Sequence, residues 1–156
     1  MKYFILSICI FFTVSIEAQN LAGAQVSFDS DRDNAGIGFK GVFGLSNSLS
    51  FSPDINYFFG SASFATVNTD LHLDLAQGNN LKFYGLGGLH FGALRSISSR
   101  SGFLGFNRDA DVNLGVNLGL GAQLFTKDNF RLFTEGKYIV SDLNRFVLSI
   151  GMLFNL

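Results

Sequence analysis

The sequence contains little cysteine, proline or tryptophan, and beyond its start it has no long apolar runs. In 156 residues there is no tryptophan, one cysteine and one proline. A transmembrane helix needs about 20 consecutive apolar residues, and no such run follows residue 16. A helical membrane protein is therefore excluded, although hydrophobic residues make up 47% of the chain. The net charge of −1 gives no reason to expect nucleic acid as a partner.

The first 18 residues carry the pattern of a cleavable secretory signal peptide. Lys2 supplies the positive start, residues 3–16 form the apolar core, and residues 16–18 end in a small residue before Gln19. A retained membrane anchor is the alternative, but the apolar core is short for a span. The only cysteine, Cys9, lies in this core, so the mature chain 19–156 should have neither a disulfide nor a reactive thiolate.

The stretch from Val112 to Leu124 alternates apolar residues with small or polar ones. The pattern has a period of two over thirteen residues, which predicts a strand with one apolar face and one polar face. Strands in soluble domains are typically about 5–6 residues long, whereas a tilted strand that crosses a bilayer needs about 9–11. This strand therefore has the length required to cross a membrane.

Seven further segments alternate in the same way. They are residues 20–28, 35–45, 49–59, 65–75, 81–91, 130–140 and 146–156. The connections after the second, fourth and sixth strands are short, and the others are polar or longer, which is the asymmetry of bacterial outer-membrane barrels. An open sheet edge is not viable in hydrocarbon, so the first and last strands must pair. The predicted fold is all-β: an eight-stranded antiparallel up-and-down transmembrane β-barrel.

Two irregularities are expected in these strands. Pro53 cannot donate to a ladder, so we expect a bulge or a weak point in the third strand. Gly85, Gly87 and Gly88 obscure the register of the fifth strand and predict a bulge there.

The inward faces of the predicted strands carry a first group of candidate residues. Their members are charged or imidazole side chains: Lys40, Asp54, Asp70, His72, Asp74, Lys82, Arg131, Glu135 and Lys137. The turn after the second strand sets Lys40 opposite Asp54, and the turn after the fourth sets Asp74 opposite Lys82. Because eight-stranded lumens are normally filled by side chains, we expect a structural network of ion pairs, with an ion path as the alternative.

Neither histidines nor carboxylates indicate a catalytic or metal site. His72 and His90 have no serine or metal-ligand motif around them, so we expect lumen histidines that are hydrogen-bonded to neighbours, and no cofactor. Residues 29–34 resemble the start of a calcium loop, but Asn34 and Lys40 stand where an EF-hand has glycine and glutamate. We expect a solvated acidic loop, with loose divalent binding as the alternative.

A second group of candidates lies on the long connection from Ala93 to Asp111. It consists of three arginines and two phenylalanines: Arg95, Arg100, Phe103, Phe106 and Arg108. Guanidinium groups on an external loop suit lipid phosphate or a partner surface, and long loops on rigid scaffolds often carry function.

Three features carry a resemblance to a known family: the segment Phe83–Leu89, the run Glu135–Tyr138 and the amphipathic closing strand. With the eight alternating segments, they make Gln19 to Leu156 resemble the small outer-membrane barrels of the OmpA-transmembrane and OmpX type, the outer-membrane beta-barrel domain family. The resemblance implies a location in the outer membrane of a Gram-negative bacterium, among lipids and lipopolysaccharide. It also implies a non-enzymatic role in envelope integrity or surface adhesion. Members usually end in an aromatic residue that the barrel-assembly machinery recognises, whereas this chain ends Phe154-Asn155-Leu156.

Three alternative functions remain open at this point. The first is a narrow pore for ions or small solutes. The second is a barrel enzyme acting on lipid, which would need a His–Ser–acid cluster at one rim. The third is a soluble lipocalin-like carrier with its apolar faces inward, which would leave Lys40, Asp54 and Asp74 on the outside.

Overall fold

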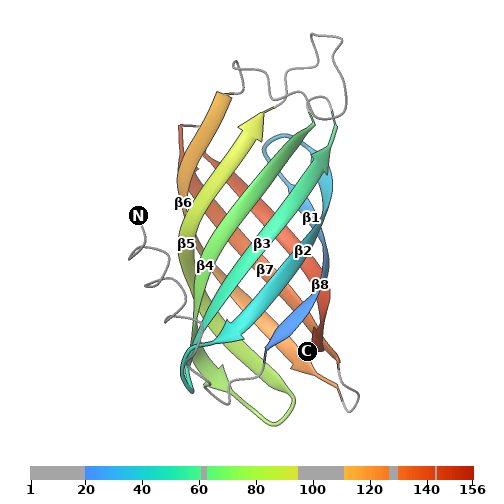
Figure 1. Ribbon diagram of the computed structural model, residues 1–156, viewed down its shortest axis with the longest axis vertical. Coiled ribbons are helices and arrows are strands. Elements are labelled where there is room, and N and C mark those ends of the chain that lie inside the picture. Colours follow the sequence, from blue (N-terminus) through green and yellow to red (C-terminus); the bar gives the residue numbers. More distant parts are fainter. Residues whose placement is uncertain (1–19, 61–62, 95–110, 127–129, 143) are drawn as a thin grey trace, which may run out of the picture.

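The computed structural model describes residues 20–60, 63–94, 111–126, 130–142 and 144–156. These residues form eight strands: β1 (Leu21–Asp29), β2 (Asn34–Gly44), β3 (Leu49–Phe59), β4 (Phe64–Gln77), β5 (Leu81–Leu94), β6 (Asp111–Phe125), β7 (Phe130–Ser141) and β8 (Arg145–Asn155). Consecutive strands pair antiparallel and β1 pairs with β8, so the sheet closes into an up-and-down barrel of tilted strands (Figure 1). The predicted all-β, eight-stranded barrel is confirmed.

The predicted signal peptide, residues 1–18, lies outside the described residues and stays a prediction. None of the described residues belongs to a helix long and apolar enough to span a bilayer.

The two faces of the sheet point as the alternation predicts. On β6, Leu118 is 57% exposed on the outside, whereas its neighbour Asn117 is fully buried in the lumen. Ile150 on β8 is 63% exposed, and Ser149 beside it is buried. The apolar residues therefore cover the outer surface, and polar residues predominate in the interior, beside two buried apolar clusters. A lipocalin-like arrangement, with its apolar faces inward, is contradicted.

Strand boundaries differ from the expected ones near one end of the barrel. β5 continues to Leu94 and β6 begins at Asp111, so the long connection is shorter than the predicted range of 93–111. Arg145 was expected in a loop, but it is the first residue of β8 and is buried. Its position follows from the same alternation, because it has the inward parity of Val147 and Ser149.

No bulge forms at Pro53, because the β2–β3 register is the same on both sides of this residue. The ladder is interrupted there, between the Lys40–Asp54 and Phe43–Phe51 pairs, so the weak point expected as the alternative is confirmed. Pro53 has no N–H to give to β2. The Ser52 hydroxyl instead donates to the carbonyl oxygen of Gly41, the residue that the register sets opposite Pro53, at 3.0 Å. A side-chain donor thus supplies the hydrogen bond that proline cannot make.

The bulge expected among the glycines of β5 is also absent, since β5 and β6 stay in one register throughout. The irregularity lies on β4 instead, at Leu75 between Asp74 and Ala76. Lys82 lies opposite Gln77, and Asp74, beyond the bulge, lies opposite Tyr84, so the prediction that Asp74 and Lys82 face each other was wrong. A Cβ on Gly88 would clash with the carbonyl oxygen of Thr69, so this glycine serves close approach of two strands rather than a bulge.

A charge on the outer face tests the membrane-spanning orientation. Leu118→Arg at the middle of β6 should lower the free energy of unfolding by about 2–4 kcal/mol, because arginine is costly at the bilayer midplane. The matched variant Leu45→Arg, in the turn after β2, should cost about 0–1 kcal/mol near the interface. Urea unfolding in lipid vesicles measures both values. Equal costs at the two positions would contradict the proposed orientation.

Candidate functional site

The predicted lumen residues all face the interior of the barrel. Seven are buried: Lys40, Asp54, Asp70, His72, Lys82, Glu135 and Lys137. Asp74 and Arg131 are half-buried, near the end where the short turns lie. The alternation of each strand puts them in the lumen, and barrel closure decides which of them meet.

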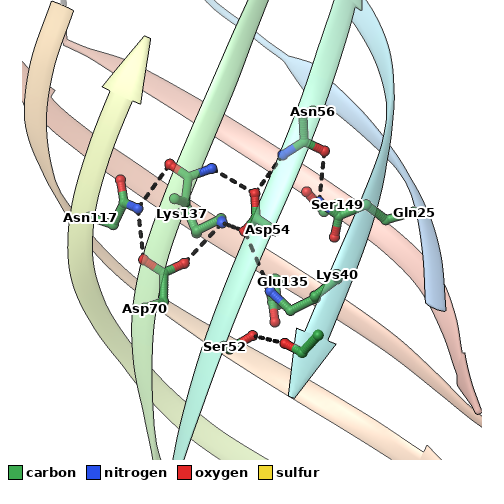
Figure 2. A network of polar contacts seen from close by, with 12 residues as sticks. Gln25, Lys40, Ser52, Asp54, Asn56, Asp70, Asn117, Glu135, Lys137 and Ser149 are labelled. Carbon is green, nitrogen blue, oxygen red and sulfur yellow. Dashed lines mark hydrogen bonds and ion pairs between the residues drawn. The ribbon is translucent and has the colours of Figure 1, made fainter. Parts of the chain in front are cut away.

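A chain of five alternating charges crosses the middle of the lumen. Lys137 Nζ donates to Asp54 Oδ2 at 2.7 Å and to Asp70 Oδ2 at 3.0 Å (Figure 2). Lys40 Nζ donates to Glu135 Oε2 at 2.9 Å and lies 3.6 Å from Asp54 Oδ2. The predicted facing of Lys40 and Asp54 is confirmed by the β2–β3 register. These side chains come from β2, β3, β4 and β7, so the ion pairs join opposite walls of the barrel.

Neutral donors satisfy the carboxylate oxygens of Asp54 and Asp70 that the lysines leave free. Asn56 and Asn68 both donate to Asp54 Oδ1, at 2.6 and 2.7 Å. Asn117 Nδ2 donates to Asp70 Oδ1 at 2.7 Å (Figure 2). Burying charges is costly unless they are paired and their other lone pairs are occupied, and the network meets both conditions.

His72 lies at the edge of the network nearer the short turns. Its ring stacks on Tyr84 with centroids 4.5 Å apart, and its Nε2 lies 3.7 Å from Glu135 Oε1. The Tyr84 hydroxyl donates to the same Glu135 oxygen at 2.7 Å. A Cβ on Gly121 would collide with the Tyr84 ring, so the missing side chain there makes room for it. Nε2 of His72 has no hydrogen-bond partner among the described residues, so this atom does not make the hydrogen bond expected for His72.

The other end of the lumen holds a cluster that sequence reasoning missed, centred on Arg145. Its Nη2 makes a short contact with His90 Nε2, and its Nη1 lies 3.8 Å from Asp29 Oδ2. His90 Nδ1 lies 2.6 Å from Asn68 Oδ1, which links this cluster to the central network. The guanidinium also lies 5.1 Å from the ring centroid of Phe64. Because Arg145 donates to Nε2, Nδ1 carries the His90 proton and donates to Asn68.

Apolar side chains fill the space around this cluster. Phe58 and Phe64 stack with centroids 4.7 Å apart and pack with Ile139 and Val147. The cavity among these residues has a volume of about 10 Å³, which holds at most about one water molecule. This part of the lumen is therefore packed rather than water-filled.

The remaining candidates divide into described and undescribed residues. Arg95, Arg100, Phe103, Phe106 and Arg108 lie outside the described residues, so their role stays a prediction. In the acidic segment, Asp29 Oδ1 accepts the Asp31 N–H at 3.2 Å, and Asp31 Oδ2 accepts the Phe146 N–H at 2.7 Å. Within the described ranges, no three histidine, cysteine or acidic side chains are placed to hold a metal ion.

The ion-pair chain predicts a specific pattern of stability. Lys137→Met removes the only ion-pair partner that Asp70 has among the described residues and should destabilise the barrel by about 3–5 kcal/mol, because it leaves a buried charge uncompensated. Adding Asp70→Asn should recover part of this loss. Lys82→Met breaks a partly exposed pair and should cost about 1 kcal/mol or less. Unfolding in lipid vesicles measures the free energy of unfolding of all three variants. If the Lys137→Met, Asp70→Asn double variant is less stable than Lys137→Met alone, the proposed pairing is contradicted.

Comparison with known proteins supports the fold. No protein-family model matches the chain, and no curated protein matches it. Among solved structures, the N-terminal β-barrel domain of Pseudomonas aeruginosa OprF matches with a TM-score of 0.69 and 15% identity, covering 89% of this chain and 99% of that one. Yersinia pestis Ail matches with a TM-score of 0.60 and 14% identity, covering 89% and 97%.

An enzyme is also among the similar structures. The outer membrane enzyme PagL matches with a TM-score of 0.51 and 12% identity, covering 88% of this chain and 98% of that one. Ail and PagL are both outer-membrane proteins. The predicted resemblance is thus confirmed at the level of the fold: this chain has the fold of the small eight-stranded bacterial outer-membrane barrels.

Proposed function

We propose that the protein is a non-enzymatic barrel that acts from the bacterial outer membrane, in surface adhesion or envelope integrity, by presenting its external loops. The observation that carries the proposal is the combination of an apolar outer surface with a lumen closed by paired charges. Such a barrel anchors its loops rigidly and leaves little room for transport.

The central network argues against the alternative of a pore. A permeant ion would have to displace Lys137 from both Asp54 and Asp70, which hold it at 2.7 and 3.0 Å. On the side of the network where the Arg145 cluster lies, the stacked rings of Phe58 and Phe64 and their neighbours leave a cavity of only about 10 Å³. A hydrated ion needs a continuous path, and these side chains stand in its way.

The histidine environments argue against the alternative of a lipid enzyme. The fold does not decide the question, because PagL is an enzyme on the same architecture. His90 is bonded to Asn68 and Arg145, and His72 contacts Tyr84 and Glu135. Among the described residues neither histidine has a serine partner, which argues against the histidine–nucleophile pair that acyl transfer would need.

The loop candidates supply the proposed contacts outside the membrane. Arg95, Arg100 and Arg108 carry guanidinium groups that suit phosphate or sulfate oxygens. Ail has been solved in complex with the heparin analogue sucrose octasulfate. By analogy, we propose an anionic saccharide surface, such as lipopolysaccharide or a sulfated polysaccharide, as the partner. Outer-membrane lipids surround the barrel, and the barrel-assembly machinery inserts it.

Single-channel recording tests the closed lumen. The wild-type protein in planar lipid bilayers should give no sustained conductance steps, because ion pairs cross the lumen. A Lys40→Ala, Glu135→Ala double variant removes the Lys40–Glu135 ion pair and the Lys40–Asp54 contact, and it should conduct more than the wild type. Frequent, stable wild-type openings would favour the pore over the scaffold.

Replacement of the long loop tests the adhesive role. Substituting residues 95–110 with glycine and serine should abolish binding of expressing cells to heparin-coated or lipopolysaccharide-coated surfaces, because three guanidinium groups are lost. Arg32→Gln, which removes one charge in the β1–β2 connection, is the matched control and should retain binding. Full binding by the loop variant would overturn the proposed role of these residues. Lipid deacylation by the purified wild type would overturn the non-enzymatic assignment.

A further inference from the structure

A polar cavity opens at the end of the barrel opposite the Arg145 cluster. It has a volume of about 560 Å³ and lies among the β2–β3, β4–β5 and β6–β7 ends. Its lining includes Ser50, Asp74, Lys82, Gln123, Phe125 and Arg131. The ion pairs of Lys137 with Asp54 and Asp70 lie deeper in the lumen, on β3, β4 and β7, and close the inner side of the cavity. The cavity is therefore open at one end of the barrel only. It could hold a small ligand but not pass one through.

Arg131 lines this cavity without a direct ion-pair partner among the described residues. Its guanidinium lies 4.8 Å from the ring centroid of Phe125, which restrains its plane. Among the described residues, it forms no ion pair within 4.0 Å, and none of its N–H groups makes a hydrogen bond. A half-buried guanidinium with free donors is suited to bind an oxyanion in a bidentate manner.

A second cation and an unsatisfied acceptor face the same space. Lys82 Nζ lies 3.1 Å from Asp74 Oδ1. The cavity lining therefore holds two cations, Lys82 and Arg131, but one carboxylate, Asp74, which pairs with Lys82. Gln123 is 1% exposed, and its Oε1 has no hydrogen-bond partner among the described residues. An unsatisfied buried acceptor requires a donor, which a ligand can provide.

We propose that this cavity binds a small polar organic anion. Its oxyanion would sit between Arg131 and Lys82, and a hydroxyl or amino group beside it would donate to Gln123 Oε1. Phosphate and carboxylate both satisfy the cations, so the shared chemistry is an oxyanion with a neighbouring hydrogen-bond donor. The site is at the opposite end from the Arg145 cluster and does not depend on the adhesive role.

The test is an NMR titration of the wild-type protein in lipid nanodiscs. The probes are glycerol 3-phosphate and glutamate, with glycerol as the uncharged control. At least one anion should bind saturably and shift the backbone amides of Lys82, Gln123 and Arg131, while those of Lys137 and Arg145 stay unchanged. The tighter probe distinguishes a phosphate ligand from a carboxylate ligand. No saturable shift with either anion would overturn the proposal.

Two variants identify the proposed contacts. Arg131→Gln should weaken binding about tenfold or more, since it removes a charged hydrogen-bonding partner. Gln123→Leu, which keeps the size but loses the acceptor, should weaken binding of the same probe by a smaller factor. Arg32→Gln, away from the cavity, is the control for net charge and should bind as the wild type does. Equal losses in Arg131→Gln and Arg32→Gln would mean nonspecific attraction and would overturn the site.

Discussion

The hydrogen-bonded seam between β1 and β8 is the constraint on which the rest of the structure depends. It runs without a register shift from the Leu21–Asn155 pair to the Asp29–Val147 pair. In hydrocarbon an unpaired backbone group costs several kcal/mol, so a sheet of these strands must close on itself. Inside the lumen, the hydroxyls of Ser27 and Ser149 lie 2.8 Å apart across the same seam. Closure thus fixes both the outer and the inner surface.

The narrow lumen that results explains why its charges are arranged as they are. Eight strands leave an interior that side chains can fill, so every lysine or carboxylate placed there must find a partner across the barrel. Lys137 meets two carboxylates, and Lys40 joins them to Glu135. The network ties together strands far apart in the sequence and blocks the path between the two ends. The ends are therefore where a ligand or partner can bind.

Local patterns predicted the strands and their faces, because a period of two reports which side of a sheet each residue occupies. A short turn also predicted that Lys40 faces Asp54. The same reasoning failed for Asp74, because the turn after β4 sets Gln77 opposite Lys82, and beyond the bulge at Leu75 Asp74 lies opposite Tyr84. Lys82 still reaches Asp74, but diagonally.

Contacts across the lumen could not be derived from the sequence. The pairs of Lys137 with Asp54 and Asp70 depend on the stagger of the closed barrel, which no single turn specifies. Arg145 was missed because polar residues before it indicated a loop, although its parity with Val147 was a usable signal. The polar end cavity likewise emerges only when three separate turns are brought together.

Cross-strand NMR contacts between β1 and β8 in lipid nanodiscs test the closed barrel most directly. The account predicts short proton distances between Val26 and Ile150 and between Ser27 and Ser149, within a single molecule. The closed barrel would be contradicted if these contacts were missing and the β1 amides exchanged rapidly with solvent hydrogen. It would also be contradicted if the contacts formed only between two copies of the chain.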